Sequence, residues 1–234
     1  MTRIRTTEAT RFQRARSEEQ RAERRRSILT AAAAMLDEMP VAAVTLNELA
    51  RRVGLAKSNV MRYFESREAV LLDLLDTAAA DFLVELTEAL PAHLDQAATA
   101  SRRAHETAAV LATSLAARPV LCELISTQAG VLEHNISTDV ALKYKRGARD
   151  SLVGLAALLG RVLPELGEEA AVKASMTTIV LVGALWVHSR PAPAVLAAYD
   201  EDPTLAFMHP PFEATLESLI ETLLIGLMAE RLDD

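Results

Sequence analysis

The chain has 234 residues, a net charge of −7 and a single cysteine, and half of its residues are apolar. A chain of this length can bury a sizeable core as one large domain or two small ones. Alanine and leucine dominate and alternating β-branched runs are missing from the sequence, which together predict an all-α fold. One cysteine cannot form an internal disulfide, which indicates a reducing, cytoplasmic environment.

The sequence predicts neither a signal peptide nor a membrane-spanning helix. The N-terminus is polar and basic and has no apolar segment behind it, so we expect no signal peptide. The longest apolar run, residues 174–187, contains three hydroxyl residues and is shorter than the ~20 residues that cross a bilayer. We therefore expect no membrane contact.

Charge is divided unevenly along the chain. Residues 1–67 contain 14 Lys and Arg against 8 Asp and Glu, whereas residues 68–234 contain 11 against 24. An acidic protein is repelled by nucleic acid, but a basic first quarter can still bind phosphates. The asymmetry indicates DNA binding through the N-terminal part.

The N-terminal part is predicted to be an arm followed by a helix. Residues 1–16 are basic and aperiodic, so we expect a flexible arm. Such an arm follows the DNA backbone or reaches into a minor groove, and the alternative is a tail without a role. Residues 18–38 then predict a first helix with an apolar stripe, and Pro40 ends it.

Residues 45–68 predict a helix-turn-helix. Thr45 and Glu48 fit a capping box at the start of one short helix, and Gly54 fits the left-handed residue that ends it. Residues 57–64 predict a second helix that turns Val60 and Phe64 inward and polar side chains outward. The alternative is an ordinary helical hairpin with a solvated face.

This stretch, TLNELARRVGLAKSNVMRYFESREAVLL, resembles the TetR family of bacterial transcription regulators. The resemblance rests on residues 25–72, with the glycine turn, the aromatic pair that closes the second helix and the Ser66-Arg67 start of a connecting helix. It implies a three-helix headpiece followed by a larger helical domain for effector binding and dimerisation. The expected boundaries are an arm over 1–16, a DNA-binding domain over 17–65 and the helical domain over 66–234.

The second helix supplies the candidate DNA-reading side chains. Four of them are placed to reach base edges in the major groove: Lys57, Ser58, Asn59 and Arg62. The resemblance adds Asn47 as a further base contact and Thr45, Tyr63 and Arg67 as phosphate contacts. Met61 departs from the family's usual tyrosine, so we interpret it as a packing residue or an apolar contact to a thymine methyl.

In the rest of the chain, apolar residues at helical spacing and prolines between them predict a series of long helices. They are expected over residues 66–90, 98–117, 119–134, 138–162, 168–189 and 211–230, with a proline-rich loop near 190–210. The helix at 168–189 is apolar nearly all round, so it must be covered on several faces. A subunit interface and a ligand-lined core would cover it.

The resemblance also implies a small-molecule site and a dimer. Effector candidates, chosen by residue type and expected inward position, are Phe82, Cys122, His134, Met176 and Trp186, and plain core packing is the alternative for each. Dimer candidates on the apolar stripe of the last helix are Leu216, Leu219, Ile220, Leu223 and Leu227. Packing of that stripe within one subunit is the alternative.

These patterns predict a homodimeric, ligand-responsive repressor that binds a pseudo-palindromic double-stranded DNA operator. The five histidines and one cysteine show no metal-ligand spacing, so we expect no metal, and we expect no cofactor. No catalytic signature is present in the sequence, so we expect no enzyme. A helical protein-binding adaptor and a transcriptional activator of the same fold remain alternatives.

Overall fold

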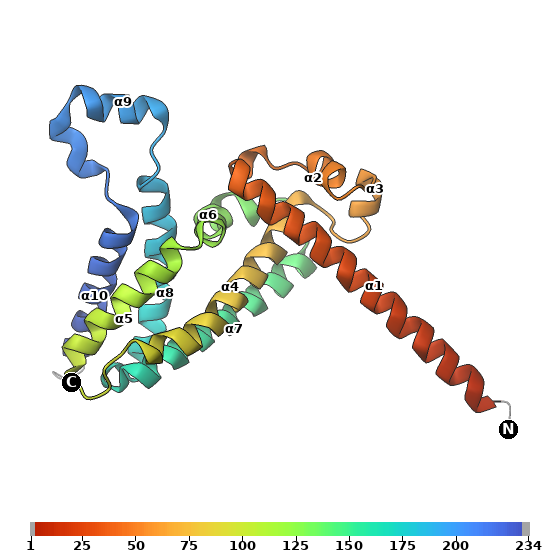
Figure 1. Cartoon of the computed structure of the whole chain (residues 1–234), viewed down its shortest axis with the longest axis horizontal. Coiled ribbons are helices and arrows are strands. Elements are labelled where there is room, and N and C mark those ends of the chain that lie inside the picture. Colours follow the sequence, from red (N-terminus) through yellow and green to blue (C-terminus); the bar gives the residue numbers. More distant parts are fainter. Residues whose placement is uncertain (1–2, 231–234) are drawn as a thin grey trace. The chain divides into compact units, whose positions relative to one another are not determined.

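The computed structural model describes the backbone of residues 3–230 and the side chains of residues 18–230 (Figure 1). Helices and their connections make up this entire range, which confirms the predicted all-α fold. The chain forms two compact units that divide between Leu74 and Leu75. Each unit is described by itself below.

The first unit is a small helical headpiece. It contains α1 (Arg3–Glu38), η1 (Val41–Ala43), α2 (Leu46–Arg52), α3 (Lys57–Val60) and the first turns of α4 (Arg67–Ala92). Helix α1 packs on α2 and α2 packs on α3. Fully buried apolar side chains come from all three helices: Ile28, Ala32, Met35, Leu49 and Val60. These residues are the apolar positions that the helical periodicity predicted.

Helix α1 begins earlier than the sequence pattern predicted. It starts at Arg3 and not near residue 18, so the backbone of residues 3–16 continues the helix in place of a separate arm. Neither proline nor glycine occurs before Pro40, and the segment is rich in arginine and glutamate, which favour helices. Residues 1 and 2 and the side chains of residues 3–16 lie outside the described range. Contact between this segment and DNA therefore stays a prediction.

The second unit is a larger helical body. After α4 it contains α5 (Ala100–Ala116), α6 (Pro119–Thr127), η2 (Gln128–Leu132), α7 (Thr138–Val162), η3 (Pro164–Leu166), α8 (Gly167–His188), α9 (Pro193–Glu201), η4 (Pro203–Met208) and α10 (Phe212–Glu230). Hydroxyl side chains begin two of these helices: Thr99 accepts from the Arg102 N–H and Ser137 from the Val140 N–H, both at 3.3 Å. The helix predicted over residues 119–134 continues as a π-helical turn after Thr127.

In this unit α6, α7 and α10 all pack on helix α8, while α10 also packs on α5 (Figure 1). By length and composition the segment Pro164–His188 could cross a membrane, with a mean hydropathy of 1.7. The bent pair of Ala100–Ala116 and Pro119–Leu132 passes the same test together. This helical segment is longer than the apolar run considered above, and 39% of its most apolar stretch is buried.

The segment between α8 and α10 differs from the rest of the unit. Its two short helices, α9 and η4, contain no buried residue, although Phe207 and Met208 are large and apolar. Prolines at both ends and between the helices interrupt regular structure, as the composition predicted.

Candidate nucleic-acid interface and ligand cavity

The turn between α2 and α3 is fixed by local hydrogen bonds. The Leu55 N–H donates to the Ala50 carbonyl at 2.9 Å and the Gly54 N–H donates to the Arg51 carbonyl at 3.3 Å. Gly54 has a φ of +68°, the left-handed conformation that glycine adopts at little cost. This pair of bonds is the Schellman arrangement that ends a helix, which confirms the predicted role of Gly54.

The start of α2 follows the prediction only in part. The Thr45 hydroxyl accepts from the Glu48 N–H at 3.2 Å, as a capping residue does. The Glu48 carboxylate does not complete the box, because Arg51 and Arg52 bind both of its oxygens. An arginine pair thus takes the place of the backbone N–H that the motif expects.

The recognition helix is shorter than predicted but presents the expected side chains. Regular α-helix covers only Lys57–Val60, and tighter turns continue it, with the Tyr63 N–H donating to the Val60 carbonyl at 2.9 Å. The polar candidates Lys57, Ser58, Asn59 and Arg62 are exposed, while Val60 and Phe64 are buried as predicted. Met61 is 49% exposed, so its side chain is available to a partner.

The phosphate candidates lie in different surroundings. Thr45 and Asn47 are exposed at the start of α2, and Tyr63 is half-buried. Arg67 is held by the protein itself: its guanidinium donates to the Val44 carbonyl at 3.3 Å and to Glu68 at 2.8 Å. Arg67 therefore fixes the start of α4 to the residue before the α2 cap, and its phosphate contact stays a prediction.

Two further arginines hold the headpiece together, and the sequence pattern missed both. Arg25 donates to the Tyr63 carbonyl at 2.9 Å and to Asp73 at 2.6 Å, and its guanidinium lies 4.2 Å from the centre of the Phe64 ring. It ties α1 to the end of the recognition helix and to α4. A basic run such as residues 24–26 gives no sign of which arginine turns inward.

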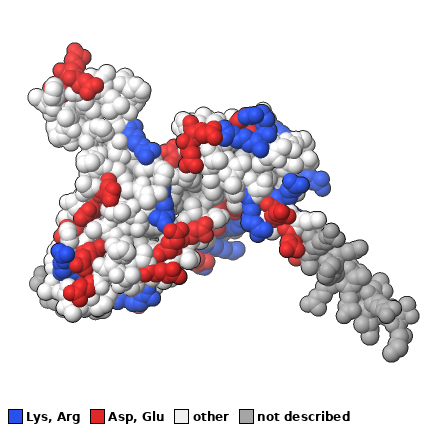
Figure 2. All heavy atoms as spheres, in the orientation of Figure 1, with Lys and Arg blue, Asp and Glu red and all other residues white. Residues whose placement is uncertain are grey.

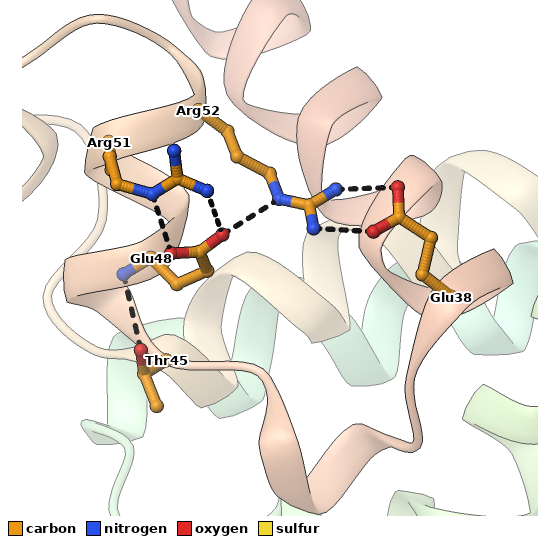
Figure 3. Close-up of polar contacts among 5 residues, drawn as sticks. All are labelled: Glu38, Thr45, Glu48, Arg51 and Arg52. Carbon is orange, nitrogen blue, oxygen red and sulfur yellow. Dashed lines mark hydrogen bonds and ion pairs between the residues drawn. The ribbon is translucent and has the colours of Figure 1, made fainter.

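Arg52 bridges α1 and α2 (Figure 3). It donates through two nitrogens to the Glu38 carboxylate, at 2.8 and 2.5 Å, and through a third to Glu48 at 3.1 Å. Hydrogen bonds from Arg51 and Arg52 lower the pKa of Glu48 to about 2, and those from Arg52 lower the pKa of Glu38. Both carboxylates are therefore charged at neutral pH.

Figure 2 shows Lys and Arg atoms at several places on the headpiece. Among residues 18–230, three of these arginines, Arg21, Arg24 and Arg62, have no carboxylate partner and lie at one place. A hollow of about 730 Å³ lies there, which we call the arginine pocket. Its lining consists of Gln20, Arg21, Glu23, Arg24, Ser27, Arg62 and Tyr63. It brings the predicted residues Arg62 and Tyr63 together with α1.

A second hollow, the ligand cavity, lies within the helical unit and measures about 470 Å³. Most of its lining is apolar and comes from α4 to α8, including Leu75, Ala79, Phe82, Leu121, Ile125, Leu152, Leu155, Met176 and Ile179. Its polar lining includes Asp76, Gln128, Tyr144, Lys145, Arg149 and Ser151. An apolar cavity with a few polar groups is typical of small-molecule sites.

Only two of the five effector candidates, Phe82 and Met176, line this cavity. Trp186 lines a separate hollow of about 440 Å³, where its ring stacks edge-on against Phe212 and its N–H donates to Glu123 at 2.9 Å. His134 is exposed at the end of η2. The structure does not bring these two residues to the cavity.

Cys122 is fully buried and its thiol donates to the Leu115 carbonyl at 3.3 Å. Burial raises the pKa of this thiol to about 12, which leaves it protonated and poorly reactive at neutral pH. Across residues 18–230, no group of three His, Cys, Asp or Glu side chains could hold a metal ion.

The dimer candidates divide between two faces of α10. Leu216, Ile220 and Leu227 are buried within the subunit, against α5 and α8, so this part of the stripe follows the alternative. Leu219 is 38% exposed and Leu223 is half-buried. The sequence pattern missed Val180 and Val187 of α8, which are 69% and 58% exposed, because that helix is apolar nearly all round.

A helix-turn-helix headpiece joined to an all-helical body defines a class of DNA-binding regulators. Residues 28–74 match the family described as bacterial regulatory proteins, tetR family, and residues 80–231 match the tetracyclin repressor-like C-terminal domain. The chain belongs to the TetR family of transcriptional regulators, and its helix-turn-helix is the family's DNA-binding element.

Individual regulators are also similar to this chain in sequence. The HTH-type transcriptional regulator EthR of Mycobacterium tuberculosis is 34% identical over 76 residues, which cover 32% of this chain and 35% of EthR. The match thus spans about a third of that curated relative.

Solved structures match over most of the chain at low identity. A TetR regulator from Rhodococcus sp. RHA1 has a TM-score of 0.53 at 15% identity and covers 88% of this chain and 96% of its own. A putative transcriptional regulator from Pseudomonas aeruginosa PAO1 has a TM-score of 0.52 at 16% identity and covers 89% and 91%. At these identities the likeness concerns the fold.

Proposed function

We propose that this regulator is a homodimeric repressor that acts in the cytoplasm and leaves its operator when a small molecule fills the ligand cavity. One observation carries the ligand response. Helix α4 lines the cavity through Leu75, Ala79 and Phe82, and the same helix begins at Arg67, which binds the Val44 carbonyl beside the α2 cap. A ligand that displaces α4 would thereby move the helix-turn-helix.

The energetic requirement for such a switch is modest. A coupling free energy of about 1–3 kcal/mol weakens operator binding from several-fold to about a hundred-fold. The ligand needs only to favour one packing of α4 over another by that amount. An activator that uses the same coupling with the opposite sign is the alternative, and a reporter gene behind the operator distinguishes the two.

The cavity lining favours a mostly apolar ligand with a hydrogen-bond acceptor. Tyr144 is buried, and burial together with the nearby Glu133 and Asp76 raises its pKa, so its hydroxyl stays protonated. A protonated hydroxyl donates to a carbonyl or ether oxygen, and Asp76, Lys145 and Arg149 are the charged residues of the lining.

Cavity filling tests the ligand site. Ala148 lines the cavity, whereas Ala157 lies exposed on the same helix, α7. The neutral dye Nile red should fluoresce in the presence of the wild type and of Ala157→Trp, but not of Ala148→Trp, whose indole occupies the cavity. Equal fluorescence with both variants would place the dye elsewhere and contradict the proposed site.

The proposed dimer forms through the outer faces of α8 and α10. Val180, Val187, Leu219 and Ile225 expose apolar surface there, and Gly226 leaves open space for a close helix approach. Val180→Glu should give a monomer in analytical ultracentrifugation. Val153→Glu, on an exposed valine of α7, should remain a dimer. A dimeric Val180→Glu variant would exclude this interface.

A further inference from the structure

The arginine pocket consists of charged groups that the headpiece does not use to hold itself together. Arg25, Arg52 and Arg67 each bind a carboxylate, whereas the described part of the chain gives no carboxylate partner to Arg21, Arg24 or Arg62. Guanidinium groups seek planar or tetrahedral oxyanions, which they bind through two parallel N–H donors. Three of them around one hollow therefore offer N–H donors to an oxyanion.

The helix geometry explains why these arginines converge. At about 100° per residue, Arg21 and Arg24 stand on neighbouring rows of α1, and Arg25 turns toward the core. Arg62 reaches the same hollow from the turn after the recognition helix, beside Tyr63. The Ser27 hydroxyl and the Gln20 amide add neutral donors, and Glu23 is the one acidic residue in the lining.

We propose that the arginine pocket binds a phosphate of the DNA backbone next to the bases that α3 reads. The proposal rests on DNA binding, which the family establishes, and is independent of repression, dimerisation and ligand response. The pocket opens beside Tyr63, so a duplex that places a groove on α3 brings its backbone to α1. Contacts of this kind fix the position of the protein on DNA without reading sequence.

This assignment changes the role of Arg62. The sequence pattern placed it among the base readers, but its neighbours in the pocket are the arginines and neutral donors of α1. Base reading then belongs to Lys57, Ser58 and Asn59, and Arg62 contributes affinity that is common to all sequences.

The test compares arginines that differ only in their place on α1. A duplex obtained by in vitro selection with the wild type, and a scrambled duplex, are titrated by fluorescence anisotropy at several KCl concentrations. Arg21→Ala combined with Arg24→Ala should weaken binding to both duplexes by the same factor. It should also reduce the slope of log K against log salt by about 2, one for each lost phosphate contact.

Arg26→Ala is the matched control. Arg26 is exposed, has no carboxylate partner in the described part of the chain and lies about 200° around the helix from Arg24, outside the pocket. It should lower the slope by much less. A wild-type slope in the double variant, or an equal loss in Arg26→Ala, would overturn the proposal.

A free phosphate ion shares the chemistry of the DNA backbone, and a second measurement separates the two. Inorganic phosphate at 10 mM, compared with KCl of equal ionic strength, should leave the Tm of the wild type unchanged in the absence of DNA. A rise in Tm that the double variant lacks would show a site for the free ion and contradict a backbone site.

Discussion

The headpiece and the helical body fix their helices by different means. In the headpiece, short helices with a small apolar core are joined by arginines: Arg25 ties α1 to the turn after α3 and to α4, and Arg52 ties α1 to α2. In the body, long helices pack through leucine and alanine around a cavity. Directional contacts hold DNA-reading side chains at fixed positions, whereas apolar packing leaves space that a ligand can fill.

Truncation of the body's core should produce the largest effect on stability. Leu124 is fully buried on α6. Leu124→Ala should lower the free energy of unfolding by about 2–5 kcal/mol, because it removes apolar contacts and leaves a cavity. Urea denaturation measures this, and Leu196→Ala on the exposed α9 should change it by less than about 0.5 kcal/mol. Equal losses would show that α9 is packed in solution.

The glycine turn of the headpiece should give the next effect. Gly54→Ala places a Cβ in open space but at a φ of +68°, so its cost of about 1–2 kcal/mol is purely conformational. Gly130 of η2 has equally open space without the left-handed backbone, and Gly130→Ala should be neutral or stabilising. Thermal unfolding compares the two variants, and a neutral Gly54→Ala would contradict the described turn.

The arginine bridge of Figure 3 should contribute less. Arg52→Ala should lower the Tm of the headpiece more than Arg51→Ala does, because Arg52 joins two helices whereas Arg51 binds only Glu48, three residues away. Circular dichroism on both variants measures the difference. If the two Tm values fall equally, the bridge between α1 and α2 has no role in stability.

The same bridge makes a small contribution that depends on pH. The pKa of Glu48 is lowered to about 2 in the folded protein from an ordinary value of 4.5. Its contribution is therefore complete above pH 4.5 and disappears as the pH falls from there toward 2. Glu48→Gln should flatten that part of the stability profile, and an unchanged acid dependence would show that Glu48 is not responsible.

Local patterns predicted most of the headpiece, and tertiary contacts account for what they missed. The Thr45 cap, the Gly54 turn and the inward Val60 and Phe64 depend on neighbours within a few residues. The partners of Arg25 lie 38 and 48 residues away, so no spacing rule reaches them.

The helical body shows the same division. Its helices agree with their predicted ranges, because proline, glycine and hydroxyl caps mark their ends. The cavity depends on where five helices meet, and residue type alone selected two lining residues, Phe82 and Met176, while Trp186 and His134 lie elsewhere. On α10, one apolar stripe serves the subunit core, and the face next to it remains exposed.

The division between base reading on α3 and phosphate binding on α1 is tested most directly by the base preferences of the protein. Selection and sequencing of bound DNA gives these preferences for three proteins: the wild type, Asn59→Ala, and the double variant Arg21→Ala with Arg24→Ala. Asn59→Ala should lose discrimination at one base pair of each half-site, by about 1–3 kcal/mol, while the double variant should keep the wild-type preference at lower affinity. A uniform loss in Asn59→Ala, or an altered preference in the double variant, would contradict the division between base reading on α3 and phosphate binding on α1.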